Sequence, residues 1–313
     1  MLVDEVSRAF RPRRGKTTVA LERVSLTVRA GEWVSILGPN GSGKSTLLRI
    51  VVGLEHADSG HAAVFGSDAG SPSARAAIGV VFQSNSLDLL LTVRENLALA
   101  GRVAGVDGPG LRERVAAVAE SMRLTDRLDD RVSTLSGGLK RRADLARALV
   151  PSPRVLILDE ATTGLDPTAR RELLGMLDQH RATHNGFTII ASTHLFDEAE
   201  RGERVVMMDR GRIVLDQHTV ELVESMNERR LIVRTGANAE NAASELARLG
   251  INVERTPRGE LAASVTPGSA SARAAVQSLA SLGCDFALTS PTLADIYERE
   301  TGRTLLGETE VTP

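Results

Sequence analysis

Short apolar runs rich in β-branched residues alternate with helix-like stretches between about residue 20 and residue 210. The runs read VSLTV, WVSIL, IGVVF, RVLIL, FTIIAS and RVVMM. Runs of this length predict buried strands, and their alternation with helical stretches predicts a mostly parallel sheet covered by helices. Several polar residues follow these strands directly. We therefore expect an α/β fold with its functional residues at the ends of the strands.

The region from about residue 90 to 150 follows a helical period. Apolar residues recur at Leu111, Val115, Val118 and Met122. Steps of three or four residues place these side chains on one face of a helix. The pattern predicts a helical subdomain within the larger α/β domain.

The pattern starts again near residue 226. LIVRT is followed by a helix-like stretch from Ala237 to Leu249, then INVERT, LAASVT, a second such stretch from Ala270 to Leu282, and CDFALTS. This β-α-β-β-α-β order is compatible with a small ferredoxin-like α+β domain, and a short helix is expected from about Thr292 to Thr301. We predict two domains, residues 1–225 and 226–313.

Composition excludes several classes of protein. Among 313 residues, 42% are hydrophobic and 25% charged, as in ordinary folded proteins, and the net charge of -2 gives no broad basic surface for nucleic acid. Cys284 is the only cysteine, so no intrachain disulfide is possible and a cytoplasmic location is expected. The opening MLVDEVSRAF lacks the apolar stretch of a signal peptide, and no apolar run approaches the roughly 20 residues of a membrane span. A membrane role would require a partner.

A glycine-rich loop follows the strand-like run WVSIL and leads into the apolar stretch LLRIVVGL. Its sequence fits the phosphate-binding pattern G-x-x-x-x-G-K-[ST]. Glycines let the backbone N–H groups approach phosphates, and the helix that follows turns its positive end to the same anion. Lys44 would bridge β and γ phosphates and Ser45 would ligate Mg²⁺, whereas the alternative is a plain glycine-rich turn. The loop consists of Gly38, Pro39, Asn40, Gly41, Ser42, Gly43, Lys44, Ser45 and Thr46.

Two carboxylates, Asp159 and Glu160, come directly after the apolar run RVLIL. Taken alone, such a pair is most often the start of a helix. Together with the phosphate loop, it predicts Asp159 as a Mg²⁺ ligand and Glu160 as the residue that orients and deprotonates the attacking water.

The tetrapeptide from Leu135 to Gly138, with the sequence LSGG, opens the helix-like stretch LKRRADLARALV. It resembles the signature of ATP-binding cassette (ABC) proteins. Gln83 after IGVVF, the run Gly164 to Pro167 after the carboxylate pair, and His194 after FTIIAST stand in the family's order. The resemblance implies a P-loop NTPase cassette with a RecA-like core, a helical subdomain and an antiparallel β edge.

The resemblance also implies roles for single residues. Gln83 would contact Mg²⁺ and the water and couple the site to the membrane partner, although a polar strand end is the alternative. His194 would contact the γ-phosphate, with a structural role as the alternative. Asp166 would cross the interface between two cassettes, unless it only starts a helix before Pro167. The signature would contact ATP held by a second cassette, and its residues are Leu135, Ser136, Gly137 and Gly138.

Phe10 is similar to the family's aromatic residue that stacks on adenine. The insert RPRRGKTT lengthens its distance to the phosphate loop, and a core phenylalanine is the alternative. The basic stretch from Arg11 to Lys16 is expected to form a solvated hairpin tip, and contact with lipid or nucleotide phosphates is the alternative. Ala161 and Leu139 depart from the residues common in the family, but neither change removes a catalytic atom. We therefore expect a homodimer with two competent sites.

The segment SNSLDLLLTVRENLALAGRVAGV and the stretch PTLADIYERETGR resemble the exporter branch that includes daunorubicin-resistance and nodulation-factor-export ATPases. This resemblance implies an ATPase that uses ATP and Mg²⁺ to drive export of a drug, lipid or glycan through a separate permease, at the cytoplasmic face of the membrane. In that branch a C-terminal domain follows the cassette, and a dimer-stabilising or regulatory domain is the alternative interpretation of this part of the chain. A soluble ABC ATPase of DNA repair or translation and a regulatory nucleotide-binding protein are the alternatives.

Overall fold

The computed structural model describes residues 1–11, 16–225, 229–234, 238–256, 259–290 and 292–302. Residues 12–15 of the expected hairpin tip lie outside this part of the chain. Contacts divide the chain into two units, Met1–Asp216 and Gln217–Pro313. The division falls ahead of helix α8 (Thr219–Ser225), which the sequence pattern assigned to the first domain.

The first unit is built on a six-stranded sheet with the order β10-β9-β3-β8-β7-β6. Strand β3 is parallel to β8 and β9, and β7 is parallel to β6 and β8. All residues of β3 and β7 are buried, because helices and a second sheet cover both faces of this sheet. The strands are β3 (Trp33–Leu37), β6 (Ile78–Val81), β7 (Val155–Asp159), β8 (Thr188–Thr193), β9 (Arg204–Asp209) and β10 (Arg212–His218).

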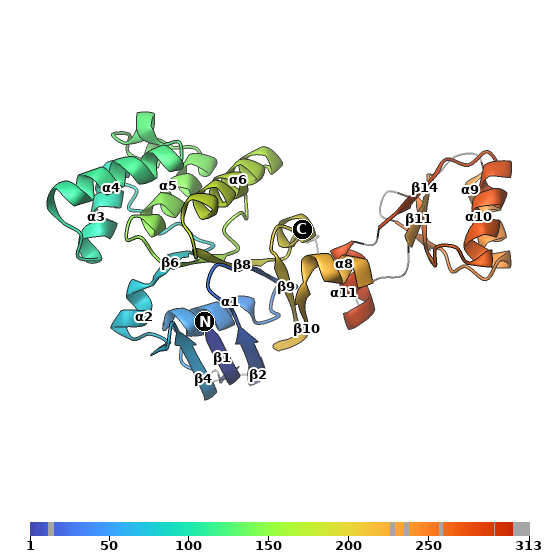
Figure 1. The fold of residues 1–313 in the computed structure, drawn as a ribbon, viewed down its shortest axis with the longest axis horizontal. Helices are drawn as coiled ribbons and strands as arrows, with labels where there is room; N and C mark the ends of the chain where they lie inside the picture. The colour runs from blue at the N-terminus through green and yellow to red at the C-terminus, as the bar shows by residue number, and fades with distance from the viewer. Residues whose placement is uncertain (12–15, 226–228, 235–237, 257–258, 291, 303–313) are drawn as a thin grey trace. The chain divides into compact units, whose positions relative to one another are not determined.

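A second, antiparallel sheet lies on the other side of helix α1 (Lys44–Val52) (Figure 1). Its order is β2-β1-β4-β5. Leu47 and Ile50 of α1 share one hydrophobic core with Val34 of the large sheet and Val6 of the antiparallel sheet. The helix that follows the phosphate loop is therefore fixed between two sheets. The strands of the second sheet are β1 (Leu2–Phe10), β2 (Thr18–Thr27), β4 (Ser59–Val64) and β5 (Ser67–Asp68).

Helices cover the opposite face of the large sheet (Figure 1). Leu111, Val115, Val118 and Met122 are all buried in the core beneath them, as the helical period predicts. Figure 1 shows α3, α4, α5 and α6 gathered in this layer. The helices and 3₁₀ turns of the unit are α2 (Pro72–Ala76), α3 (Val93–Val103), α4 (Gly108–Ser121), η1 (Thr125–Arg127), η2 (Val132–Thr134), α5 (Gly137–Leu149), α6 (Pro167–Thr183) and α7 (Phe196–Ala199).

The second unit contains a four-stranded antiparallel sheet with the order β12-β13-β11-β14. The central strands β11 and β13 are the first and third along the chain, which is the arrangement of a split βαβ fold. Helices α9 and α10 pack on its core through Leu246 and Leu279. The elements after α8 are β11 (Arg229–Val233), α9 (Ala239–Arg248), β12 (Glu254–Arg255), β13 (Leu261–Val265), α10 (Ala270–Ser281), β14 (Phe286–Thr289) and α11 (Leu293–Thr301).

None of the described helices is both long enough and apolar enough to cross a membrane.

Candidate functional site

At two positions of the loop between β3 and α1, only glycine fits the backbone. A Cβ atom on Gly38 would clash with the carbonyl oxygen of Met208, and a Cβ atom on Gly43 would clash with the carbonyl oxygen of Ala20. Gly43 also has a φ of +106°, which side-chain-bearing residues rarely adopt. The loop can therefore bring its N–H groups close to an anion at the start of α1.

Lys44 is buried inside this loop, with 3% of its side chain exposed. Its Nζ donates hydrogen bonds to the carbonyl oxygens of Gly38 at 2.8 Å and Pro39 at 3.0 Å. Glu160 Oε1 lies 3.6 Å from the same nitrogen. Burial lowers the pKa of Lys44, and the charge of Glu160 opposes this effect. The ammonium group is held at the loop, where it can bind a phosphate.

Asp159 is the last residue of β7 and is buried. Its Oδ1 accepts hydrogen bonds from Ser45 Oγ at 2.8 Å and from Ser192 Oγ at 2.7 Å. A carboxylate and a hydroxyl at adjacent positions are hard oxygen ligands of the kind Mg²⁺ binds. Among the described residues no group of three or more His, Cys, Asp or Glu side chains could hold a metal, but Mg²⁺ commonly uses one or two carboxylates together with substrate phosphates.

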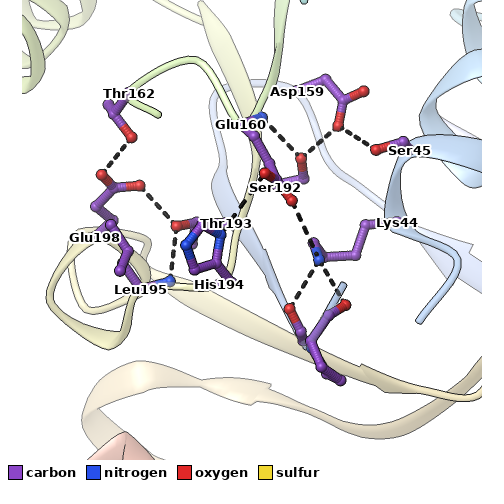
Figure 2. A network of polar contacts seen from close by, with 12 residues as sticks. Lys44, Ser45, Asp159, Glu160, Thr162, Ser192, Thr193, His194, Leu195 and Glu198 are labelled. Carbon is purple, nitrogen blue, oxygen red and sulfur yellow. Dashed lines mark hydrogen bonds and ion pairs between the residues drawn. The ribbon is translucent and has the colours of Figure 1, made fainter. Parts of the chain in front are cut away.

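Glu160 lies between the side chains of Lys44 and His194 (Figure 2). Its Oε1 faces Lys44, and its Oε2 lies 3.7 Å from Nδ1 of His194. Its φ of +48° is unusual for a residue with a side chain. Its backbone N–H holds this conformation by donating to the carbonyl oxygen of Ser192 at 3.2 Å and to the hydroxyl of Ser192 at 3.1 Å. The carboxylate is therefore held beside the phosphate loop.

The signature residues lie at the start of α5. The Ser136 hydroxyl caps the helix by accepting a hydrogen bond from the backbone N–H of Leu139 at 3.4 Å. Ser136 and Gly137 are exposed, whereas Leu135 is buried in the core of the helical layer. No hydrogen bond or ion pair of the described residues joins this tetrapeptide to the phosphate loop of its own chain. The positive end of α5 is therefore open to solvent.

Asp166 caps helix α6, as expected of a residue that starts a helix before Pro167. Its Oδ1 accepts hydrogen bonds from the backbone N–H groups of Thr168 at 2.9 Å and Ala169 at 3.0 Å. The hydrogen bonds from Ala169 and then Thr168 lower the pKa of Asp166. The residue is also exposed, so the cap leaves it accessible to a second chain.

Gln83 and Phe10 stand apart from the carboxylates. Gln83 is exposed, and its carbonyl oxygen accepts a hydrogen bond from Arg141 at 2.7 Å. No contact described for it reaches Asp159 or Ser45. Phe10 is 39% exposed, which excludes a core role, and the guanidinium of Arg8 lies 5.0 Å from its ring centroid.

The sequence did not reveal several residues that hold the site together. Ser192 donates to the carboxylate of Asp159 and accepts from the backbone N–H of Glu160, and Glu198 accepts hydrogen bonds from Thr162 and Thr193 (Figure 2). The sequence did contain one signal for Ser192, because the apolar strand β8 ends in two polar residues. The structure then pairs Ser192 with Asp159 through the parallel register of β7 and β8.

Comparison with known proteins agrees with this geometry. The sequence model of the ABC transporter family matches residues 21–163. The Nod factor export ATP-binding protein I of Neorhizobium galegae is 38% identical over 294 residues, which cover 93% of this chain and 82% of that protein. The protein of the same name from Rhizobium meliloti is 36% identical over 288 residues, covering 91% and 84%.

Solved structures of ATP-binding cassettes share the fold. A dimeric cassette in a post-hydrolysis state, bound to ADP and Pi, has a TM-score of 0.64 at 28% identity and covers 70% of this chain and 98% of its own. The protein cbiO1 of Clostridium perfringens, part of an ABC transporter complex, has a TM-score of 0.62 at 28% identity and covers 80% and 96%.

The chain therefore belongs to the family of ABC transporter ATP-binding proteins. It is the ATP-binding, ATP-hydrolysing subunit of an ABC transporter, and its fold is the P-loop NTPase cassette that the motifs predicted. The alternative of a soluble ATPase in DNA repair or translation is not favoured by these relatives.

Proposed function

We propose that this chain works as a homodimer that energises export of a drug, lipid or glycan through a separate membrane permease, to which it is bound at the cytoplasmic face. The similarity to Nod factor export proteins supports export, because it extends over 93% of the chain in one of them. The observation that carries the proposal is the contact of Glu160 with both Lys44 and His194 at the phosphate loop. The same chain also carries the signature at the start of α5, so both halves of a two-chain site are encoded in one subunit.

The residues around the phosphate loop bind Mg²⁺ and ATP in this proposal. Mg²⁺ bound by Ser45 and Asp159, with Gln83 as a further ligand, would offset the charge of the phosphates. Lys44 binds the β and γ phosphates, and His194 contacts the γ-phosphate. Phe10 stacks on adenine through the face of its ring that Arg8 leaves free.

Glu160 acts as the general base in this proposal. In the described structure its carboxylate pairs with Lys44 at 3.6 Å, a distance longer than that of a strong charge-assisted hydrogen bond. A bound triphosphate offers Lys44 a more highly charged partner. Glu160 then keeps a free carboxylate oxygen with which to orient a water molecule and take its proton as the oxygen of water attacks the γ-phosphorus. The bond between the γ-phosphorus and the β–γ bridging oxygen breaks in the same step, so that ADP leaves and phosphate is formed.

The signature completes the site of the other subunit. Ser136 and Gly137 are exposed at the positive end of α5, an arrangement suited to an anion. Ser136 and Gly138 therefore contact the γ-phosphate of ATP held by the second chain, Leu135 anchors the tetrapeptide, and Asp166 crosses the same interface. The dimeric cassette that resembles this chain supports this assembly.

A groove in the first unit provides a surface for the permease. Its volume is about 660 Å³, and it lies between the helical layer and strand β6, with Asp88, Leu99, Val103 and Arg147 among its lining residues. Val103 is 82% exposed and Leu99 is 50% exposed. Exposed apolar residues that adjoin a groove mark interaction sites. We propose that a segment of the permease docks in this groove.

Two measurements test the proposed function. Glu160→Gln should retain ATP binding, accumulate as an ATP-bound dimer and lose nearly all steady-state hydrolysis, because the amide cannot accept the proton of water. Undiminished hydrolysis would remove Glu160 from the role of base. Purification of the full-length chain in mild detergent should also recover a multispanning membrane protein, and recovery of ribosomes or DNA in its place would contradict the transporter role.

A further inference from the structure

Glu198 is a buried carboxylate that contacts three separate segments near the hydrolytic residues, two of which, at Thr162 and Thr193, are seen in Figure 2. It belongs to the short helix α7 and is 8% exposed. Its Oε1 accepts a hydrogen bond from Thr162 Oγ1, and its Oε2 accepts one from Thr193 Oγ1 at 2.7 Å. Arg170 Nε lies 3.3 Å from Oε1. Because removing a carboxylate from water is costly, such burial is retained where the partners matter.

The two threonines stand next to the residues assigned to hydrolysis. Thr162 follows Glu160 by two positions, and Thr193 immediately precedes His194. The Thr193 hydroxyl also accepts a hydrogen bond from the backbone N–H of Leu195 at 3.0 Å. One hydroxyl thus fixes the residues on both sides of His194 and is itself held by Glu198.

The turn that carries Glu160 depends on such support. A residue with a side chain at a φ of +48° is strained by about 1–2 kcal/mol, and its surroundings must hold it there. The backbone N–H of Thr163 donates to the carbonyl oxygen of Glu160 at 3.1 Å, and that of Leu165 donates to the carbonyl oxygen of Thr162 at 3.1 Å. Glu198 ties this double turn to the segment of His194.

Arg170 links the same carboxylate to helix α6. Its Nη1 also lies 3.4 Å from Asp197 Oδ2 on α7. Asp166 caps the first turn of α6, and its carbonyl oxygen accepts a hydrogen bond from the backbone N–H of Arg170 at 3.0 Å. The cation balances the charge of Glu198 and connects it to the helix that presents Asp166.

We propose that Glu198 is a positioning residue for ATP hydrolysis, which sets the placement of Glu160 relative to His194 through Thr162 and Thr193. This inference rests on the proposed function. Glu198 makes no described contact with the phosphate loop, so its loss affects the hydrolytic step and leaves the binding of ATP intact. An effect on kcat with little effect on affinity separates positioning from binding.

Glu198→Gln tests the role in the full-length chain. The carboxylate of Glu198 accepts one hydrogen bond on each oxygen, whereas an amide has one acceptor oxygen and one donor NH₂ group. In the variant, one of the two threonine hydroxyls therefore faces a donor, and its hydrogen bond to residue 198 is lost. We expect kcat for ATP to fall about tenfold or more, while the Kd for a fluorescent ATP analogue changes less than about threefold. Asp129→Asn is the control, because Asp129 also pairs with an arginine, is 81% exposed and lies outside the contacts described for Glu198. Its kcat should stay within about twofold.

A double variant tests whether Glu198 acts through Glu160. In the Glu160→Gln background, Glu198→Gln should lower the residual hydrolysis by less than about twofold, because residues that act as a unit are not additive. A further tenfold loss there would overturn the proposal. Normal kcat in Glu198→Gln would also overturn it, provided that Glu160→Gln is inactive. Undiminished hydrolysis in Glu160→Gln itself would instead remove the proposed function of that residue.

Two further variants decide the matter if Glu198→Gln fails to fold. Thr162→Val and Thr193→Val each remove one hydroxyl and keep the branched side chain. Each should lower kcat severalfold with the Kd for the nucleotide analogue unchanged. Normal kcat in both variants would overturn the proposal.

Discussion

Ser192 offers a quantitative test of how the site is held together. Its buried hydroxyl donates to Asp159 Oδ1 at 2.7 Å and accepts from the N–H of Glu160 at 3.1 Å. In Ser192→Ala, Asp159 Oδ1 keeps only its bond from Ser45, while the N–H of Glu160 keeps the carbonyl oxygen of Ser192 at 3.2 Å. A hydrogen bond to a charged group contributes about 1.5–3 kcal/mol. We expect the free energy of unfolding to fall by about 2 kcal/mol.

Denaturant unfolding followed by tryptophan fluorescence measures this change. Trp33 is the only tryptophan and is buried in β3, so its signal reports the first unit. Ser35→Ala is a matched control. Ser35 is as deeply buried on β3, and among the described residues its hydroxyl has no hydrogen-bond partner. Its replacement should be close to neutral or stabilising. Equal losses in the two variants would refute the assignment of stability to the bonds of Ser192.

Three further predictions concern other parts of the first unit. Lys44→Ala should raise the Kd for ATP in a fluorescent-nucleotide displacement assay, and unchanged affinity would contradict its phosphate contact. Asp166→Ala should lower the free energy of unfolding by about 1 kcal/mol through loss of a helix cap; Asp166→Asn should keep that stability but reduce hydrolysis, and normal hydrolysis in it would argue against an interface role. Burial, and then the charge of His184, lowers the pKa of His180 to about 4. Between pH 4 and 6.5 the unfolded state therefore binds a proton at His180 more strongly than the folded state does. The contribution of neutral His180 to the free energy of unfolding should be complete above about pH 6.5 and be lost as the pH falls towards 4. In His180→Gln the free energy of unfolding should depend less on pH over this range.

Much of the fold followed from residue periodicity. Buried positions were predictable in the helix from Leu111 to Met122, because apolar residues recur there with the period of a helix. They were also predictable in the strand VLIL, because a strand buried on both faces is apolar throughout. The phosphate loop was predictable because its glycines are required by local backbone geometry. The division between the two units was harder to predict. The sequence pattern breaks near residue 225, whereas the contacts group the chain from Gln217 onward with the second unit.

The support of the site depends on contacts that periodicity does not encode. Ser192 reaches Asp159 because β7 and β8 pair in one particular register. Glu198 meets Thr162 because the turns after two different strands lie side by side. The role of Gln83 stays a prediction from its motif position: Arg141 donates to its backbone carbonyl oxygen, and its side chain is exposed.

The central claim is that each ATP site is formed by two chains. Full-length Lys44→Ala and Ser136→Arg subunits should each be inactive alone, because each homodimer has both sites damaged. In a mixed dimer, however, one site combines the intact loop of one chain with the intact signature of the other. Mixing equal amounts should restore hydrolysis to about a quarter of the wild-type rate, since half of the dimers would carry one intact site. A mixture no more active than either variant alone would contradict the two-chain site.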